Sequence, residues 1–285
     1  MNEELAMPSE TDSVKLYVLD TSKMSYTKSM QCLLSPSMFT PSERARIGRF
    51  YFAKDAMLAI ASIYIQKRVV SEAIGCPISE VGLSKTASGR PFSAKATRAS
   101  SYFDYNVSHH GSLVVCVCGW LNGLRGTRET GPGIGVDVML CEPLYDGPWM
   151  EDLRDAFHPS EWETIQTSHN PTQTLFMIWT CKEAVLKATG IGIVVDLTTV
   201  LVQISQPDQL EDSPHSLQQT VAASVNFQGR EWSVTIVQLK HTTAAAKKTY
   251  LLAYTIPSNC RSINPQVHYL QEFPKDLFIE PKEHS

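Results

Sequence analysis

The clearest helical pattern of apolar residues lies between Asn170 and Gly190. Asn170 is a preferred N-cap residue, and Pro171 follows it at a position where a fixed φ and a missing N–H cost nothing. Gly190 can take the left-handed conformation that commonly ends a helix. The sequence therefore predicts one amphipathic helix, on which Glu183 and Lys187 project from the same side, one turn apart.

Shorter patterns predict the elements of the first half. Thr40 and Glu43 have the spacing of a capping box, with Pro41 at the first position of the helix that they open. Period-two alternation and turn residues set the other boundaries. In chain order, the predicted elements are a strand at 15–20, one long helix at 41–73, and strands at 81–86, 103–107 and 113–118.

A stretch rich in glycine at 119–132 is the clearest connector in the chain. After it, Ser160 and Glu163 have the spacing of a second capping box. The second half is predicted to contain a strand at 133–140, a short helix at 149–157, helices opening at 160 and 170, and strands at 199–204, 221–227, 231–239 and 250–256. Prolines and polar residues then predict a polar tail at 257–285.

Both halves thus follow the plan of a strand, then helix, then several strands. We predict the α+β class, with two similar subdomains at 1–125 and 126–256. The chain has 285 residues, 43% of them hydrophobic, which suits one large domain or two fused small ones.

Charge and cysteine content exclude several classes of protein. The net charge of −4 argues against nucleic-acid binding, and no apolar run has the length of a membrane span. Seven cysteines without regular spacing, and no secretory leader, predict a cytosolic protein without disulfides or structural zinc. Residues 41–100 carry ten Lys or Arg against four Asp or Glu, which indicates an anionic small ligand or an acidic partner.

Asp137 is a carboxylate inside an otherwise apolar strand. Alternation places it with Gly135 and Met139 on one face of that strand. A structural aspartate held by hydrogen bonds is one interpretation. The other is a ligand for a hard cation, because Asp137 and Glu183 together would offer carboxylate oxygens to Mg²⁺. For Glu183 and Lys187, the alternative is a solvated ion pair on the helix surface.

Two further segments could contact phosphate. The strand predicted at 103–107 leads into Ser108 and His109, which could present a hydroxyl group and an imidazole to phosphate oxygens. A turn carrying Lys85 and Arg90 could bind a nucleotide phosphate, although basic turns are usually only solvated.

These segments resemble the motifs of the 4′-phosphopantetheinyl transferases of the surfactin-synthetase-activating type. The W-x-x-K-E-A-x-x-K motif corresponds to residues 179–187, and the G-I/V-D strand motif ends at Asp137. The F-N-x-S-H motif corresponds to 105–109, with Tyr105 in place of Phe, and a basic residue followed by proline stands at 90–91. Residues 43–55 are similar to the early helix of the metazoan members that serve aminoadipate-semialdehyde dehydrogenase.

One position departs from the bacterial pattern. Many bacterial members carry a second acid two residues after the aspartate of the strand motif, where this chain has Met139. Two carboxylates then remain, so that a water would replace the third ligand of the metal. The metazoan members share this methionine.

The resemblance implies two subdomains related by pseudo-two-fold symmetry, with the active site in the cleft between them. It implies transfer of 4′-phosphopantetheine from coenzyme A to a serine of apo acyl or peptidyl carrier proteins, with release of adenosine 3′,5′-bisphosphate. The expected carriers include fatty acid synthase and aminoadipate-semialdehyde dehydrogenase. We expect a cytosolic monomer that binds neither nucleic acid nor membrane.

The resemblance also assigns roles to residues. Asp137 and Glu183 would hold Mg²⁺, and Glu183, directly or through a metal-bound water, would take the serine proton. Lys187 would stabilise the charge on the departing phosphate. The expected contacts of coenzyme A are Arg46, Lys85, Arg90, Asn106, Ser108, His109, Asp137 and Lys187.

Two other functions stay open at this point. A metal-dependent nucleotide phosphohydrolase would use an ordered water in place of the carrier serine. A non-catalytic protein that binds coenzyme A would need no metal. The chain lacks a Walker-type phosphate loop and a dense cluster of His and Asp, which disfavours the hydrolase.

Overall fold

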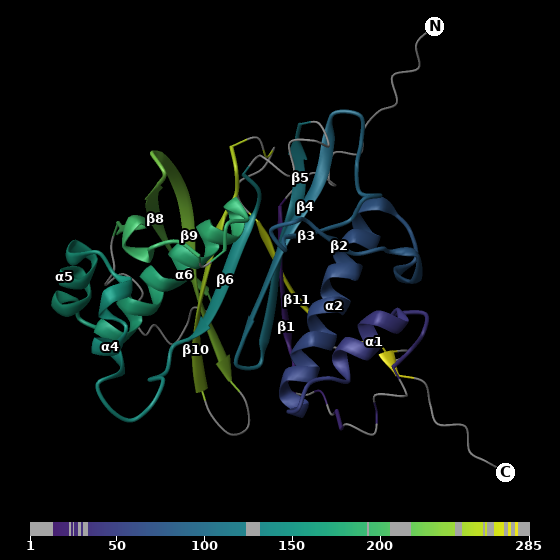
Figure 1. Cartoon of the computed structure of the whole chain (residues 1–285), viewed down its shortest axis with the longest axis horizontal. Coiled ribbons are helices and arrows are strands. Elements are labelled where there is room, and N and C mark those ends of the chain that lie inside the picture. Colours follow the sequence, from purple (N-terminus) through teal and green to yellow (C-terminus); the bar gives the residue numbers. More distant parts are fainter. Residues whose placement is uncertain are drawn as a thin grey trace, which may run out of the picture.

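The structure is a computed structural model that describes residues 14–22, 24, 26–27, 30, 34–123, 132–192, 194–205, 218–242, 247–258, 260, 265–270, 273–274 and 277–278. Two sheets whose strands are mostly antiparallel stand side by side, and each has a long helix on its outer face (Figure 1). This mixture of helices and sheets confirms the α+β class. The pseudo-two-fold symmetry stays a prediction.

The first sheet has the order β11-β1-β5-β4. Its strands are β1 (Lys15–Asp20), β4 (Ser101–His110), β5 (Leu113–Asn122) and β11 (Gln266–Leu270). The helices α1 (Pro41–Ile47) and α2 (Ala53–Ile74), a 3₁₀ turn at Ile78–Glu80 and the small hairpin of β2 (Ser84–Lys85) and β3 (Pro91–Phe92) accompany it.

The second sheet has the order β6-β10-β9-β8-β7. Its strands are β6 (Gly135–Leu140), β7 (Leu201–Ile204), β8 (Gln218–Phe227), β9 (Arg230–Thr242) and β10 (Lys247–Thr255). The helices of this half are α4 (Trp149–Asp152), α5 (Pro159–Thr167) and α6 (Pro171–Thr189), with 3₁₀ turns at Arg154–Ala156 and Leu197–Thr199. Among the described residues, no helix is both long and apolar enough to cross a bilayer.

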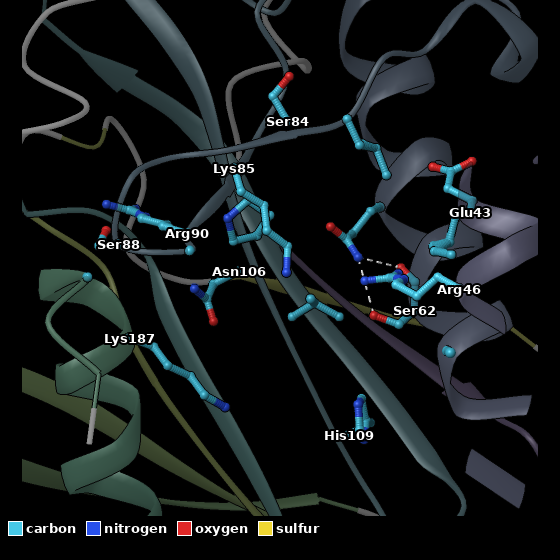
Figure 2. A pocket seen from close by; sticks show the side chains of 18 of the residues that line it. Glu43, Arg46, Ser62, Ser84, Lys85, Ser88, Arg90, Asn106, His109 and Lys187 are labelled. Atoms are coloured by element: carbon cyan, nitrogen blue, oxygen red, sulfur yellow. Dashed lines mark hydrogen bonds between the residues drawn. The ribbon is translucent and has the colours of Figure 1, made fainter. Parts of the chain in front are cut away.

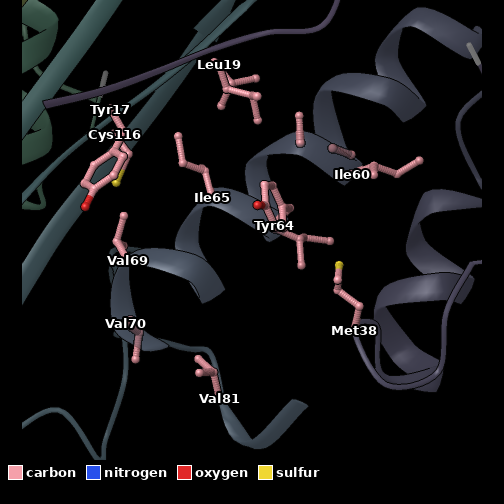
Figure 3. Close-up of a cluster of buried hydrophobic side chains, with 14 of the residues drawn as sticks. Tyr17, Leu19, Met38, Ile60, Tyr64, Ile65, Val69, Val70, Val81 and Cys116 are labelled. Carbon is pink, nitrogen blue, oxygen red and sulfur yellow. The ribbon is translucent and has the colours of Figure 1, made fainter. Parts of the chain in front are cut away.

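The structure has three apolar cores, of which one joins the two halves. In the first, α2 packs on the first sheet, with Ile65 and Tyr64 facing Tyr17 and Leu19 of β1 (Figure 3). The second surrounds α6. The third lies between the two sheets, where Val18 of β1 meets residues of β6 and β10. Strand β1 is therefore buried on both faces, which explains its uninterrupted apolar sequence.

Successive side chains of β6 alternate between its two faces. Val136 and Val138 enter the core between the sheets, so Gly135 and Asp137 face α6. A Cβ atom at Gly135 would lie 1.9 Å from the carbonyl oxygen of Ala184, so only glycine lets α6 lie this close to the strand. The caps predicted for α6 are confirmed: the Asn170 side chain accepts from Gln173 N–H, and Gly190 is left-handed.

Four expectations about elements need correction. The single helix at 41–73 is two helices, because Gly48 closes α1 and Phe52 is extended before α2 begins. The strand at 81–86 is reduced to β2, and the short helix at 149–157 is α4 followed by a separate 3₁₀ turn. The capping box of α5 is formed by His158 and Glu161, two residues earlier than predicted.

A fifth correction concerns the predicted polar tail. Residues 266–270 form β11, which pairs in parallel with β1, and Leu277 is buried in the first core. The edge of β1 supplies backbone partners that a sequence pattern cannot indicate. The division of the chain at 125 and 126 stays a proposal, since residues 124–131 lie outside the described part.

Candidate functional site

A cavity of about 640 Å³ lies between the two halves. Its walls come from α1, α2, the β2–β3 hairpin, β4 and the C-terminal end of α6 (Figure 2). Six of the residues expected to contact coenzyme A line it: Arg46, Lys85, Arg90, Asn106, His109 and Lys187. The remaining two, Ser108 and Asp137, are buried directly behind Lys187.

Asp137, Ser108 and Lys187 form a closed triangle of hydrogen bonds. Asp137 Oδ1 accepts from Ser108 Oγ at 2.8 Å and from Lys187 Nζ at 2.7 Å, and Lys187 Nζ also donates to Ser108 Oγ at 2.9 Å. The three residues come from β4, β6 and α6, so the triangle joins the two halves. Lys187 therefore pairs with Asp137, and the surface pair with Glu183 is not the role that the structure gives it.

Glu183 lies one turn before Lys187 on the face of α6 that packs against β6. Its side chain is buried, and Oε1 has no hydrogen-bond partner among the described residues. Removal from water and, to a smaller extent, the negative charge of Asp137 raise the pKa of this carboxyl group to about 7, while the positive charge of Lys187 opposes the shift. Lys187, one turn further along α6, bonds Asp137 directly, which places the two carboxylates on the facing surfaces of α6 and β6.

The two carboxylates fit a divalent cation. Asp137 Oδ2 is also buried without a hydrogen-bond partner among the described residues. Two unsatisfied, adjacent carboxylate oxygens cost free energy unless a proton or a cation joins them. Mg²⁺ prefers such oxygens and takes its other ligands from waters and substrate phosphates. The described residues contain no group of three or more His, Cys, Asp or Glu that could hold a metal ion.

Arg90 has partners that differ from the expected ones. Its guanidinium group is buried in an ion pair with Asp104, and weaker bonds lead to the carbonyl oxygens of Ala188 and Ile134. Asp104 also accepts from the backbone N–H of Ile134 at 2.8 Å. These contacts oppose the expected phosphate role of Arg90, because its charge is already neutralised, and they make it a clamp between the two halves.

Arg46 and Lys85 instead carry positive charge that faces the cavity from opposite walls (Figure 2). Both side chains are exposed, as a binding cation must be. The one carboxylate among the residues of this wall, Glu43, is paired with buried Lys67 at 2.9 Å. The cavity is thus electropositive on balance, and an anionic ligand suits it.

Asn106 and His109 of β4 both line the cavity. Asn106 Oδ1 accepts from Val136 N–H at 3.4 Å, so Asn106 also joins β4 to β6. The surrounding protein and the positive charge of Lys187 lower the pKa of His109 below 6.5, and the imidazole is therefore neutral near pH 7. His110, to which the sequence assigned no role, accepts from Leu140 N–H at 2.9 Å.

One buried pair was not foreseen. Lys182, beside Glu183, forms an ion pair with Glu161 of α5 at 2.7 Å and donates to the carbonyl oxygens of Leu197 and Val200. Glu161 also accepts from Val202 N–H of β7 at 2.8 Å. The lysine of the motif thus fixes α6 against its neighbours. A charged residue within an apolar helical face was the available signal.

Two family models match the chain. Residues 26–120 match "4'-phosphopantetheinyl transferase, N-terminal", and residues 133–245 match the "4'-phosphopantetheinyl transferase superfamily". Among curated proteins, the L-aminoadipate-semialdehyde dehydrogenase-phosphopantetheinyl transferase of Schizosaccharomyces pombe is 36% identical over 224 residues, which are 77% of this chain and 83% of that protein.

More distant relatives share the same theme. The human protein of the same name is 29% identical over 180 residues, which are 61% of this chain and 55% of the human protein. The 4'-phosphopantetheinyl transferase HetI of Nostoc sp. is 28% identical over 176 residues, which are 60% of this chain and 68% of HetI. The chain therefore spans about half the length of its human relative, and the matches confirm the resemblance that the motifs indicated.

Proposed function

Because the chain belongs to the 4′-phosphopantetheinyl transferase superfamily, we propose that it moves 4′-phosphopantetheine from coenzyme A to a serine hydroxyl of apo carrier domains. The second product is adenosine 3′,5′-bisphosphate. The observation that carries the proposal is the triangle of Asp137, Ser108 and Lys187, which stands beside Glu183 at one end of an electropositive cavity.

The cavity accounts for the binding of coenzyme A. Its volume of about 640 Å³ lies within the usual range for small-molecule and cofactor sites. Arg46 and Lys85 supply the cations for the phosphates of the nucleotide, including its 3′-phosphate. His109, neutral near pH 7, contributes a hydrogen bond rather than a charge. In this proposal Arg90 does not bind a phosphate group, because Asp104 already neutralises its charge.

Asp137 and Glu183 are the residues that would hold Mg²⁺. The bound ion would neutralise the crowded pyrophosphate and make its β-phosphorus easier to attack. Ser108 and Lys187 saturate Oδ1 of Asp137 and thereby fix the direction of Oδ2. Ser108 is thus a positioning residue in this proposal rather than the phosphate contact that we expected.

Glu183 and Lys187 have separate roles in the transfer. The serine oxygen attacks the β-phosphorus of coenzyme A, and the bond from that phosphorus to the bridging oxygen of the pyrophosphate breaks. Glu183, directly or through a metal-bound water, takes the serine proton. Lys187 has three donors, two of them engaged, and the third stabilises the charge on the leaving phosphate.

We propose carrier domains of the fatty acid synthase and aminoadipate-semialdehyde dehydrogenase types as acceptors. The name of the fission yeast relative, which is 36% identical, supports the second of these. A cytosolic, monomeric state remains part of the proposal. The two halves of one chain already supply both walls of the cavity, so a second copy is not needed to complete it.

The test is incubation with coenzyme A, Mg²⁺ and an apo acyl carrier protein, followed by mass spectrometry of the carrier. We expect the carrier to gain one phosphopantetheine. Glu183→Gln should lower the rate about 10³-fold, as the loss of a general base and of a metal ligand requires. The matched control is Glu163→Gln on the exposed face of α5, which should keep the wild-type rate.

The other two functions give different results in the same assay. Adenosine bisphosphate released without a modified carrier would indicate a phosphohydrolase. Binding of coenzyme A that neither Mg²⁺ nor Glu183→Gln changes, with no product of either kind, would indicate a binding protein. Either result would overturn the proposed transfer.

A further inference from the structure

Tyr51 and Phe52 form an exposed aromatic pair between α1 and α2. Their exposed fractions are 85% and 64%. The two rings contact each other edge to face, with centroids 4.9 Å apart. The neighbouring Ile47 and Phe50 turn inward to the core, so the connection itself is well anchored. Two adjacent aromatic side chains in water lose the burial that usually stabilises them.

Neither side chain is explained by the folding of the connection. Phe52 occupies the N-cap of α2, where it makes no side-chain hydrogen bond. Phenylalanine is a poor N-cap, because it cannot satisfy the free N–H groups of the first turn. By contrast, α1, α5 and α6 begin with the side-chain caps Thr40, His158 and Asn170. Phe52 is therefore neither buried nor able to cap the helix.

The surface around the pair is positively charged. Arg49 and Lys54 are exposed on either side of it, and the positive end of the α2 dipole lies between them. Asp55 is the only acid between residues 44 and 55. The whole chain has a net charge of −4, so this positive patch is a local feature and not a consequence of composition.

The patch is continuous with the mouth of the cavity. Arg46 and Phe50, which precede the pair, line the cavity together with His109 and Lys187. Burial lowers the pKa of His110 at the end of β4, and the charge of Lys54 lowers it further, so Lys54 at the start of α2 lies within electrostatic range of that strand end. A protein seated on the patch would therefore stand next to the bound coenzyme A.

We propose that Tyr51 and Phe52, with Arg49 and Lys54, form a docking surface for the acidic carrier domain that accepts the phosphopantetheine. The two rings contact apolar side chains of the carrier, and the two cations contact its carboxylates. This inference rests on the proposed function, since it names a second contact of the same acceptor. Aromatic residues set among cations are typical of protein interfaces that recognise an acidic partner.

The test compares the double variant Tyr51→Ser/Phe52→Ser with the full-length wild type in the transfer assay. The matched control is Tyr269→Ser on β11, where the side chain is 51% exposed. We expect the KM for apo acyl carrier protein to rise about tenfold or more in the double variant. The KM for coenzyme A, the kcat at saturating carrier and the melting temperature should stay unchanged. Arg49→Glu/Lys54→Glu should raise the KM for the carrier too, and mostly at low salt.

Three results would overturn the surface. An unchanged KM for the carrier is the first. If the wild type is a dimer and the double variant is a monomer, the aromatic pair is an interface between copies of the chain. If the double variant loses binding to vesicles of anionic lipid as much as it loses binding to the carrier, the aromatic pair is a membrane contact. If the wild type leaves the carrier unmodified, the proposed function fails instead, and direct binding of the carrier to wild type and double variant still decides whether the surface exists.

Discussion

Glu183 is placed where its charge is unfavourable. Its side chain is 8% exposed, and Oε1 has no hydrogen-bond partner among the described residues. Asp137 adds a second negative charge, and the pKa of Glu183 rises to about 7. Such an arrangement weakens the fold in the absence of a cation, and it is a common consequence of building a reactive site.

We therefore expect Glu183→Gln to stabilise the metal-free protein at high pH while it removes transfer. The folded carboxyl group titrates at about 7 and the unfolded one near 4.5, so the folded state binds more protons between these values. Wild-type stability consequently falls as the pH rises through this window, whereas glutamine does not titrate. In urea unfolding with EDTA, the variant should gain about 1–3 kcal/mol over the wild type between pH 5 and pH 8.

Mg²⁺ supplies the control for this prediction. At pH 8 the ion should stabilise the wild type more than the variant, since it binds the folded state through Glu183. Glu163→Gln, at an exposed carboxylate, should show neither effect. A difference between variant and wild type that is equal at pH 5 and pH 8 would contradict the interpretation of the raised pKa.

At the scale of elements, the end of α6 is held against the first half by Arg90. This arginine of the β2–β3 hairpin pairs with Asp104 of β4, and both contact the backbone of Ile134 just before β6. Arg90 also reaches the carbonyl oxygen of Ala188 on α6. The position of Lys187 therefore depends on contacts that lie outside the triangle it forms.

Arg46→Ala and Arg90→Ala should thus have opposite profiles. Arg90→Ala leaves Asp104 buried and unpaired, which should cost about 3 kcal/mol or more of stability. Arg46→Ala removes an exposed side chain, so its cost should be below about 0.5 kcal/mol. The affinity for coenzyme A should fall about tenfold in Arg46→Ala, and much less for dephospho-coenzyme A.

Denaturant unfolding and calorimetric titration of both variants measure these quantities. The comparison is internal, because each arginine serves as the control for the other. Arg90→Ala with wild-type stability and a selective loss of coenzyme A affinity would restore the phosphate role that the sequence suggested and contradict the clamp.

The same elements show what the sequence could and could not indicate. The caps of α6 were predictable, because Asn170 and Gly190 act on their own backbone. The break between α1 and α2 was not, since the residues at 48–52 carry no proline, and Phe52, the extended residue before α2, is a poor N-cap. Strand β11 lacked a signal for a related reason: its partner, β1, lies some 250 residues earlier in the chain.

The site followed the same division. Motifs identified Asp137, Glu183 and Lys187, and the structure brings them to one place. The partners of these residues could not be inferred from the sequence, because Ser108 reaches Asp137 across the two halves. The ion pair of Arg90 with a buried acid on another strand could not be inferred either.

At the scale of the whole molecule, one apolar core lies between the two sheets and includes residues of both halves. The first sheet is completed by the far end of the chain. Strand β11 covers the edge of β1, His268 stacks on Tyr17 with centroids 5.0 Å apart, and Leu277 is buried in the first core. The segment that the sequence marked as a tail is thus part of the fold of the first half.

Removal of residues 258–285 should therefore destabilise the protein, although it leaves the catalytic residues in place. The truncation exposes the backbone of β1 as an open edge and removes the apolar contacts of Leu277 and Phe278. Losing one buried leucine alone costs about 2 kcal/mol, and an open edge promotes aggregation. We expect the shortened chain to be largely insoluble, or to melt well below the full chain when followed by circular dichroism.

A second truncation that removes only 279–285 keeps both contacts and should match the full chain. If the form ending at 257 instead remained soluble, melted with the full chain and transferred phosphopantetheine at the same rate, β11 would be dispensable and the first half would fold without it.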